Sequence, residues 1–417
     1  ILIFVTASVA TGGLGLSDTV AANMQSNLTA FSYLLPLFGA VIVDKYIGAR
    51  YTTPVGMFIA AAGYFTGGIA KSSAGVYAMI FLVSLGLALF KNGAIIGRVI
   101  TDKSQMDPAF SMRYTLVNVG AFIGTFLVGI LYKDVFAKDG VLGFAPCFKM
   151  AALMMVLGGL WYIFVCWRFL GDLGKLPFKK TLTEEEKAAE AKKKEETGTK
   201  QPLTTIEKKR IGAIFVASLF SIVFWIFWYL GYMPVYFYWA ENMDWVVAGY
   251  QVPSTWFDAA NSLFCVILGP VTAALWKKLA ARPQGDMSLF RKTGLGIAII
   301  GVGYLFYAAI DIMRGGEKAS VLWLIVFAFL LTMGEMFFSP LGHSFISKYS
   351  PSRYLAVMMS VWGFATFIAA KSYGPVYGLL FGGKIEFKVA CIGVAVVSFA
   401  AALIMIALDK TLSALVD

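Results

Sequence analysis

Long apolar stretches separated by short polar loops dominate the hydrophobic pattern of this chain. A helix needs about twenty apolar residues to cross the hydrocarbon core of a bilayer. We expect about twelve membrane-spanning helices, the first of which is partial, because its apolar residues near 1–11 are too few to span. The sequence opens within that helix, so we expect further residues upstream. The other spans are expected near residues 23–44, 52–70, 76–98, 112–133, 146–169, 211–238, 254–276, 290–312, 320–346, 354–382 and 386–408.

A polar segment over residues 171–210 divides these spans into two sets of six. It contains TLTEEEKAAEAKKKEETGTKQP, in which acidic and basic blocks alternate with almost no apolar side chains. Such a segment cannot bury enough surface to fold by itself. We expect a tether, with a lock at the cytoplasmic mouth as the alternative. The pattern predicts an N-terminal six-helix bundle (1–170), a charged cytoplasmic linker (171–210) and a C-terminal six-helix bundle (211–417).

The two halves resemble each other weakly. PLFGAVIVDKYIGAR closes the second span of the first half, and GPVTAALWKKLAAR closes the second span of the other half. In both segments, small residues precede an apolar turn and a basic loop. Two six-helix halves around a site at the bilayer midplane are the layout of the major facilitator superfamily. The fold class predicted is therefore all-α integral membrane, with that two-bundle arrangement.

Composition supports a membrane protein. Hydrophobic residues make up 59% of the 417 residues and charged residues 14%, whereas a soluble domain carries about a quarter charged residues. The mean hydropathy of +0.74 points the same way. The lipid bilayer is therefore an expected partner of the chain.

The formal net charge of +11 invites a nucleic-acid interpretation, but the basic residues are not arranged on one face with interleaved aromatic side chains. They gather instead in alternate loops, and the opposite loops GLGLSDTVAANMQS and ENMDWVVAGYQVPST contain no Lys or Arg. Loops rich in Lys and Arg face the cytoplasm. We therefore expect a multi-pass protein of the cell membrane with cytoplasmic termini and linker, and no nucleic-acid partner.

The sequence offers no chemistry for an enzyme or a metal site. The four cysteines lie in or beside apolar runs without metal or disulfide spacing, and we interpret them as small buried hydrophobic residues. There is no His cluster, nucleophile elbow or paired carboxylate arrangement. A Gly-x-x-x-x-Gly-Lys-Ser/Thr motif is also absent, which disfavours ATP-driven pumping. No catalytic residue, metal or cofactor is expected.

Two charged residues interrupt stretches that are otherwise apolar. Lys91 lies in MIFLVSLGLALFKNGAIIG and Glu335 lies in VLWLIVFAFLLTMGEMFFSPLG. A charge at membrane depth costs about 2.5–3.5 kcal/mol on insertion scales, so it persists where it pairs, lines a wet cavity or has a function. Because the two residues lie in opposite halves, we expect a polar cavity between the halves. A structural ion pair is the alternative, although such pairs are weak sources of stability.

Several segments resemble the proton-dependent oligopeptide transporter (POT) family of that superfamily. FSMRYTLVNVGAFIG, GEMFFSPLGHSFISKYSP and MMSVWGFATFIA closely resemble its fifth-, tenth- and eleventh-helix signatures. DKYIGAR, LFKNGAIIG and VPSTWFDAANSLFCVILGP are similar to its second-loop, fourth-helix and eighth-helix segments. The resemblance covers nearly the whole chain in the right order. It implies a secondary transporter that imports di- and tripeptides, or peptide-like zwitterions, with protons by alternating access.

The resemblance also implies a peptide site. Lys91 is expected to bind the peptide carboxylate, and Glu335 is expected to bind its amine and to take part in proton coupling. Further substrate contacts are expected from Tyr33, Asn118, Trp225, Asn261 and Trp362. The asparagines offer both donors and acceptors to peptide amides; joining of helices by the asparagines and packing by the tryptophans are the alternatives. Asp44, Lys45 and Arg50 are expected to secure a loop at the inward-facing gate.

The chain departs from the family pattern in two places. The family's Glu-x-x-Glu-Arg motif falls before Ile1. In the seventh helix, FWIFWYLGY places Trp228 and Tyr229 where carboxylates are usual. Glu335 is then the only acid expected near the centre of a helix, unless Asp258 reaches the cavity. Binding at the central site is thus better supported than proton coupling.

Two more residues leave alternatives open. Lys371, within the eleventh span, is expected to reach the outer interface by snorkelling, or else to add a cation to the cavity. His343 is expected to pack between helices, with a titrating switch as the alternative. The competing functions are a POT-like carrier of another small organic solute with altered proton coupling, and a non-transporting receptor or scaffold with a collapsed cavity. We expect the protein to act as a monomer.

Overall fold

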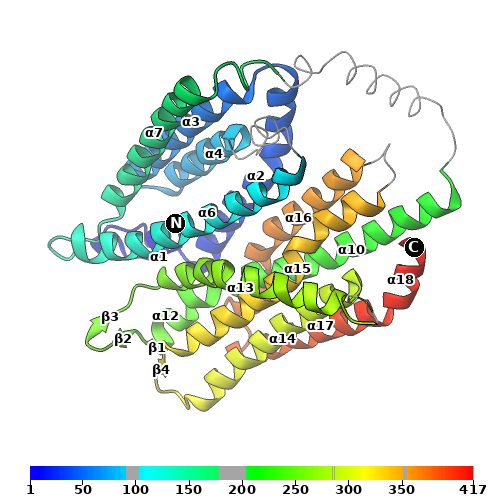
Figure 1. The fold of residues 1–417 in the computed structure, drawn as a ribbon. Coiled ribbons are helices and arrows are strands. Elements are labelled where there is room, and N and C mark those ends of the chain that lie inside the picture. Colours follow the sequence, from blue (N-terminus) through cyan, green and yellow to red (C-terminus); the bar gives the residue numbers. More distant parts are fainter. Residues whose placement is uncertain (91–102, 178–202, 284, 286, 351–354, 417) are drawn as a thin grey trace.

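The protein is almost entirely helical over the residues that the computed structural model describes, which are 1–90, 103–177, 203–283, 285, 287–350 and 355–416 (Figure 1). The N-terminal group of helices consists of α1 (Leu2–Thr6), α2 (Asp18–Lys45), α3 (Ala49–Ile69), α4 (Ser73–Phe90), α6 (Lys103–Ile130) and α7 (Phe144–Phe169), with a 3-10 turn, η1 (Val9–Thr11), and a π-helical turn, η2 (Leu131–Val135).

The C-terminal group consists of α10 (Thr205–Leu230), α11 (Met233–Tyr236), α12 (Tyr238–Asn242), α13 (Trp256–Ala280), α14 (Leu289–Met313), α15 (Trp323–Tyr349), α16 (Leu355–Phe381), α17 (Phe387–Ala407) and α18 (Asp409–Val416). Two short strand pairs complete it: β1 (Met243–Asp244) runs parallel to β4 (Ala319–Ser320), and β2 (Val246–Val247) runs antiparallel to β3 (Tyr250–Gln251).

These helices agree with the hydrophobic pattern. Every expected span overlaps a helix, although the end of the fourth span beyond Phe90 and the linker over 178–202 lie outside the described residues. Eight helices of the described part are long and apolar enough to cross a membrane. All four cysteines are buried with free thiols, as expected.

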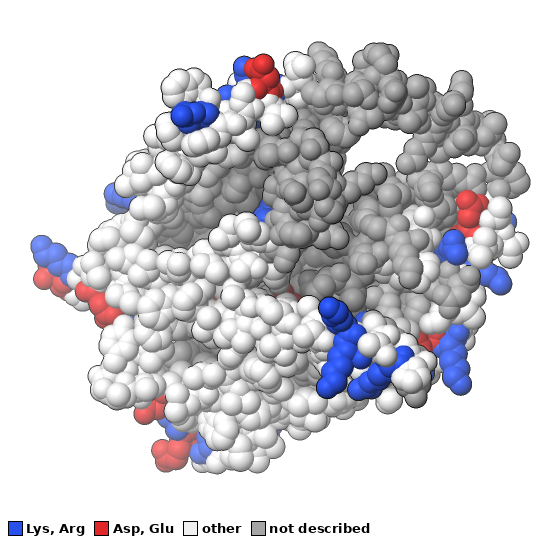
Figure 2. All heavy atoms as spheres, in the orientation of Figure 1, with Lys and Arg blue, Asp and Glu red and all other residues white. Residues whose placement is uncertain are grey.

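The surface is also that of a membrane protein. Large apolar side chains are exposed along the lengths of the helices, as on α7 at Leu153, Leu157 and Trp161. On the face shown in Figure 2, the described charged side chains lie mostly near helix ends, with uncharged atoms between them. An exposed apolar surface of this extent needs a partner, and here lipid is the fitting one.

Within each group, helices pack closely because small residues let their backbones approach. In the N-terminal group, α3 packs on α4 and α7. A Cβ added at Gly56 of α3 would lie 2.6 Å from the carbonyl oxygen of Gly86 in α4. In the C-terminal group, α14 packs on α15 and α17, and α13 packs on α15.

The two groups meet along α2 and α16, and along α6 and α13. The α2–α16 approach is uneven. A Cβ added at Gly374 would lie 2.8 Å from Ser26 Cβ and 2.9 Å from the carbonyl oxygen of Ala22, but one added at Gly363 would lie 3.7 Å from Leu37. The two helices are therefore tightest where α2 begins and α16 ends.

That tight contact lies at the end of the molecule that carries the short strands, here called the β-strand end (Figure 1). Tyr250 of β3 donates a hydrogen bond to Asp134 of η2 at 2.7 Å, and Lys133 Nζ donates to the Gln251 carbonyl at 2.6 Å. The Asp134 hydrogen bond raises the pKa of the Tyr250 hydroxyl. These contacts join the two groups at the β-strand end.

Candidate functional site

A cavity of about 410 Å³ lies between the two groups of helices. This volume falls in the range of small-molecule sites, about 300–1,000 Å³. The N-terminal group contributes the side chains of Ile1, Leu2, Ile3, Gln25, Thr29 and Thr125. The C-terminal group contributes Trp228, Tyr229, Tyr232, Met233, Tyr236, Thr255, Asp258, Asn261, Ser262 and Tyr373.

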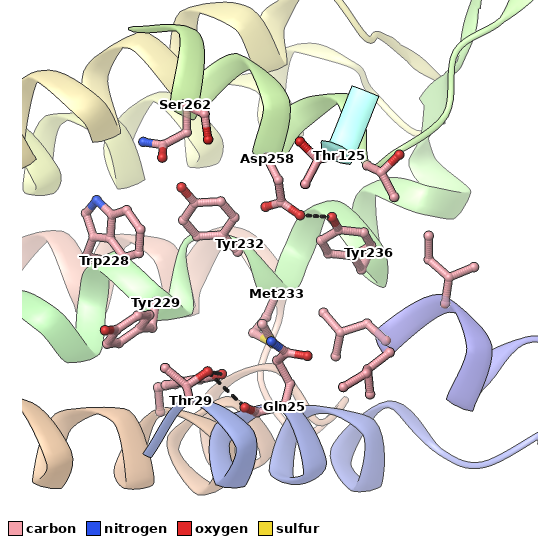
Figure 3. A pocket seen from close by; sticks show the side chains of 16 residues that line it. Gln25, Thr29, Thr125, Trp228, Tyr229, Tyr232, Met233, Tyr236, Asp258 and Ser262 are labelled. Carbon is pink, nitrogen blue, oxygen red and sulfur yellow. Dashed lines mark hydrogen bonds between the residues drawn. The ribbon is translucent and has the colours of Figure 1, made fainter. Parts of the chain in front are cut away.

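Aromatic rings from α10, α11 and the turn between them form one wall of the cavity (Figure 3). Trp228, Tyr232 and Tyr236 all line this wall. The Trp228 and Tyr232 ring centroids lie 4.9 Å apart. On the other side of α10, Tyr229 stacks on Tyr373 of α16 with centroids 5.1 Å apart.

The regular helix breaks within this wall. α10 ends at Leu230, and α11 begins at Met233 with Pro234 in its first turn. Proline has no backbone N–H to donate, so it suits the first turn of a helix, where that donor would have no intrahelical partner. Beyond α10, Tyr232 packs on Phe257 of α13 with ring centroids 5.2 Å apart, and Tyr236 donates to Asp258 of the same helix.

Asp258 projects into the cavity from the first turn of α13. Its carboxylate accepts a hydrogen bond from the Tyr236 hydroxyl (Figure 3). A helix N-terminus favours a negative charge, which supports an ionised side chain here. Asp258 therefore reaches the cavity, so Glu335 is not the only acid at this site.

Glu335, in the middle of α15, lies directly behind the cavity wall. Asn261, which lines the cavity, donates to Glu335 Oε2 at 3.4 Å and to Thr332 Oγ1 at 2.8 Å. Cys265 Sγ lies 3.8 Å from the same carboxylate. The Trp228 indole lies beside Glu335, yet its buried Nε1 makes no hydrogen bond of ordinary geometry. An acid, an amide and an indole N–H therefore cluster at and behind this wall of the cavity.

Of the residues expected to contact substrate, Asn261 lines this cavity and others surround it. Trp225 packs edge-to-face on Trp228, with centroids 5.4 Å apart. Trp362 stacks on Phe338 at 5.7 Å, and Phe338 also contacts Trp225. Both tryptophans therefore extend the aromatic wall away from the cavity.

Tyr33 and Asn118 approach the site from the N-terminal group. The Tyr33 side chain lies close to the Tyr229 hydroxyl. Asn118 donates to the Tyr114 carbonyl of its own helix at 3.0 Å. The side chain of Tyr114 in turn lies beside Cys265 of α13, so this part of α6 faces the Glu335 cluster.

Lys91, expected to oppose Glu335, lies outside the described residues. Within the described residues, no Lys or Arg forms an ion pair with Asp258 or Glu335. No group of three or more His, Cys, Asp or Glu in this described part is placed to hold a metal ion.

The remaining candidates lie away from the cavity. Asp44 and Lys45 end α2, but their side chains lie outside the description, as does that of His343. The Arg50 guanidinium donates to the Gly171 carbonyl, which ties α3 to the segment after α7. Lys371 is exposed on α16 and donates to Asn27 of α2.

The sequence did not single out most of the aromatic wall. Tyr232 and Tyr236 follow Trp228 and Tyr229 in FWIFWYLGYMPVY at spacings of three and four. That periodicity of polar-tipped rings is the signal that could have identified them. The sequence indicates Trp228 and Tyr229 only as positions where acids are missing.

Comparisons with known proteins place the chain among transporters. A family model described as POT family matches residues 173–381. The chain is 24% identical over 413 residues to the uncharacterized transporter YclF of Bacillus subtilis, covering 89% of this chain and 81% of that protein. It is 24% identical over 400 residues to the di-/tripeptide transporter of Lactococcus lactis subsp. cremoris, covering 84% and 78%.

A solved structure extends this similarity to the fold. A mutant of a peptide transporter POT, crystallised with alafosfalin, superimposes with a TM-score of 0.86 at 23% identity, covering all of this chain and 91% of that one. The likeness confirms the fold class expected from the sequence. Within that fold, this chain has a cavity between its two groups of helices.

Proposed function

The chain belongs to the POT family, a family of transporters with the major facilitator fold, and we propose that it imports di- and tripeptides, or peptide-like zwitterions, together with protons. It is a multi-pass membrane protein. The observation that carries the proposal is the cavity between the two groups of helices, with Asp258 in its wall and Glu335 behind Asn261.

This arrangement suits the constant parts of a peptide. Glu335 attracts the peptide amine, and the side-chain amide of Asn261 can donate to a backbone carbonyl or accept from an N–H. The rings of Trp228 and Tyr232 accommodate varied side chains without specific hydrogen bonds. Lys91 is proposed to bind the carboxylate, and Tyr33, Asn118, Trp225 and Trp362 support the wall.

Transport is proposed to proceed by rocking of the two bundles, 1–170 and 211–417, about the cavity. The contacts at the β-strand end, Tyr250–Asp134 and the tight α2–α16 approach, hold that end closed. Glu335 is proposed to carry the coupled proton, because its protonation removes the negative charge that attracts the peptide amine. Arg50, with Asp44 and Lys45, is proposed to secure the opposite gate.

We further propose that the β-strand end faces outward in the cell membrane, with the termini and the linker in the cytoplasm. The support is the distribution of basic residues, since the loops that hold η1 and the β2–β3 hairpin include long stretches free of Lys and Arg. A monomer is the proposed working unit, because the two groups of helices of a single chain enclose the cavity among the described residues.

One observation favours a second candidate, a POT-like carrier of another small organic solute with altered coupling. Trp228 and Tyr229 form part of the cavity wall at the positions where seventh-helix acids were expected. A non-transporting receptor with a collapsed cavity is disfavoured by the 410 Å³ volume.

Uptake into liposomes tests the proposal. Purified protein is reconstituted, and labelled Ala-Ala is added with and without an inward proton gradient. We expect gradient-dependent accumulation that unlabelled dipeptides inhibit and that a protonophore abolishes. Protein-free liposomes provide the control. Uptake that no dipeptide inhibits would overturn the substrate assignment, and accumulation unaffected by the protonophore would overturn proton coupling.

A further inference from the structure

We propose that Asp258, with Tyr236 and the rings of Trp228 and Tyr232, forms a second cation site in the cavity, so that the transporter prefers peptides with a basic side chain. The inference rests on the proposed function and deepens it by naming the class of peptide. It assigns to Asp258 a role in specificity that is separate from the role of Glu335.

The first support is the geometry of the Asp258 carboxylate. Oδ2 accepts the hydrogen bond from Tyr236, and Oδ1 has no hydrogen-bond partner among the described residues. Figure 3 shows the side chain projecting from α13 toward α11, beside the cavity. The Tyr236 hydroxyl therefore orients the carboxylate while one oxygen remains for a ligand.

The second support is the charge of the cavity. Asp258 is the one acidic residue among the described residues that line it, and that lining includes no Lys or Arg. A carboxylate in a protein interior is costly, and a bound cation relieves that cost. A carboxylate that lines a cavity concentrates ligands of opposite charge beside it.

The third support is the aromatic wall. Trp228 and Tyr232 line the same cavity, with ring centroids 4.9 Å apart, and Tyr236 contacts the carboxylate directly. Aromatic faces attract ammonium and guanidinium groups, and tryptophan attracts them most strongly. A carboxylate beside such rings is suited to an organic cation.

The two acids are spaced for one ligand. Asp258 and Asn261 lie three residues apart on α13, about 4.5 Å along the helix axis, and Asn261 donates to Glu335. A peptide whose amine approaches Glu335 can therefore place a second positive group near Asp258. The lysine side chain, an ammonium on a flexible four-carbon stem, has the reach and the charge for this.

Competition in the liposome assay tests the proposal with full-length protein. Unlabelled Ala-Lys, Ala-norleucine and Ala-Glu compete with labelled Ala-Ala. Norleucine matches the lysine stem but lacks the ammonium. We expect Ala-Lys to inhibit at about tenfold lower concentration than Ala-norleucine, which corresponds to about 1.4 kcal/mol, and Ala-Glu to inhibit least.

Variants then assign the preference to Asp258. In Asp258→Asn the Ala-Lys to Ala-norleucine ratio should fall to about one, and Asp258→Glu should keep it well above one. Retention in Asp258→Glu separates loss of charge from misfolding. Asp244→Asn, the same change at an exposed residue outside the cavity, should keep the parent ratio.

Three results would overturn the inference: no preference for Ala-Lys in the parent, an unchanged ratio in Asp258→Asn, or an equal loss of affinity for all three peptides. The last result would make Asp258 a proton or structural site. Failure of the proposed function is distinguishable, because then no dipeptide would compete in the parent protein.

Discussion

Substitution of Gly374 by alanine should loosen the β-strand end and expose the cavity there. The added Cβ would lie 2.8 Å from Ser26 Cβ and 2.9 Å from the carbonyl oxygen of Ala22. A backbone carbonyl cannot rotate away, so α2 and α16 must separate. Overpacking of this kind costs about 1–3 kcal/mol. If that cost falls on the closed state alone, the population open at this end rises about 5- to 150-fold.

Gly363→Ala is the matched control on the same helix. Its Cβ would lie 3.7 Å from Leu37, an ordinary contact, so the equilibrium should barely change. Comparing the two variants removes any general effect of alanine on α16. Both changes also raise helix propensity by the same amount, about 1 kcal/mol, so this effect cancels in the comparison.

Thiol labelling measures the opening. A reporter, Gln25→Cys, is placed in the cavity wall of both variants, and a membrane-impermeant thiol reagent is added from outside the cell. The four native cysteines are buried, so the background should be low. We expect faster labelling in Gly374→Ala and near-parent labelling in Gly363→Ala. Equal rates in the two variants would refute the reasoning that the tight α2–α16 contact holds this end closed.

Other perturbations follow from the same structure. Glu335→Gln should abolish proton-driven accumulation in liposomes while leaving downhill exchange of dipeptides measurable; retained accumulation would remove Glu335 as the coupling acid. Tyr250→Phe should cost about 0.5–1.5 kcal/mol of the contact with Asp134 and speed thiol labelling several-fold, and a parent-like rate would deny that contact a role. Because Asp134 raises the pKa of Tyr250, the hydroxyl donates below its ordinary pKa near 10. The thiolate is the reacting species, so the parent labelling rate is divided by that of Tyr250→Phe at each pH; this ratio should stay flat between about pH 6 and 8 and rise as pH increases through the raised value. Phe327→Ala, at a fully buried ring, should lower stability by about 3–5 kcal/mol in thermal unfolding, whereas Phe329→Ala, at a 38% exposed ring of the same helix, should cost less; the reverse order would contradict the packing described for α15.

The helices could be predicted well because membrane-spanning segments must satisfy their backbone hydrogen bonds internally and must be apolar over their whole length. Phe387–Ala407 is such a segment, and the pattern predicts it within a few residues. The family motifs predicted the polar cluster of Asn261 and Glu335, which the structure brings together at 3.4 Å. Each of these features is marked by a short segment of sequence, so it can be recognised without knowledge of the tertiary structure.

The cavity wall was harder to predict. A helix that is apolar on all sides does not reveal which face lines a cavity, so the roles of Tyr232 and Tyr236 depended on the break between α10 and α11. Asp258 lies in the first turn of α13. Helix boundaries are the least certain part of sequence-based assignment, and a shift of one turn would have placed this acid in the loop.

The unequal lengths of the helices have a consequence for the choice of lipid. α17 has 21 residues, or about 31 Å at 1.5 Å per residue, close to the hydrocarbon thickness of a typical bilayer, about 30 Å. α2 has 28 residues, about 42 Å, so it must tilt or extend into the headgroup layer. Hydrophobic mismatch has a modest cost for each ångström. Acyl-chain length should therefore shift the tilt of α2 against α16, and with it the turnover of the reconstituted protein.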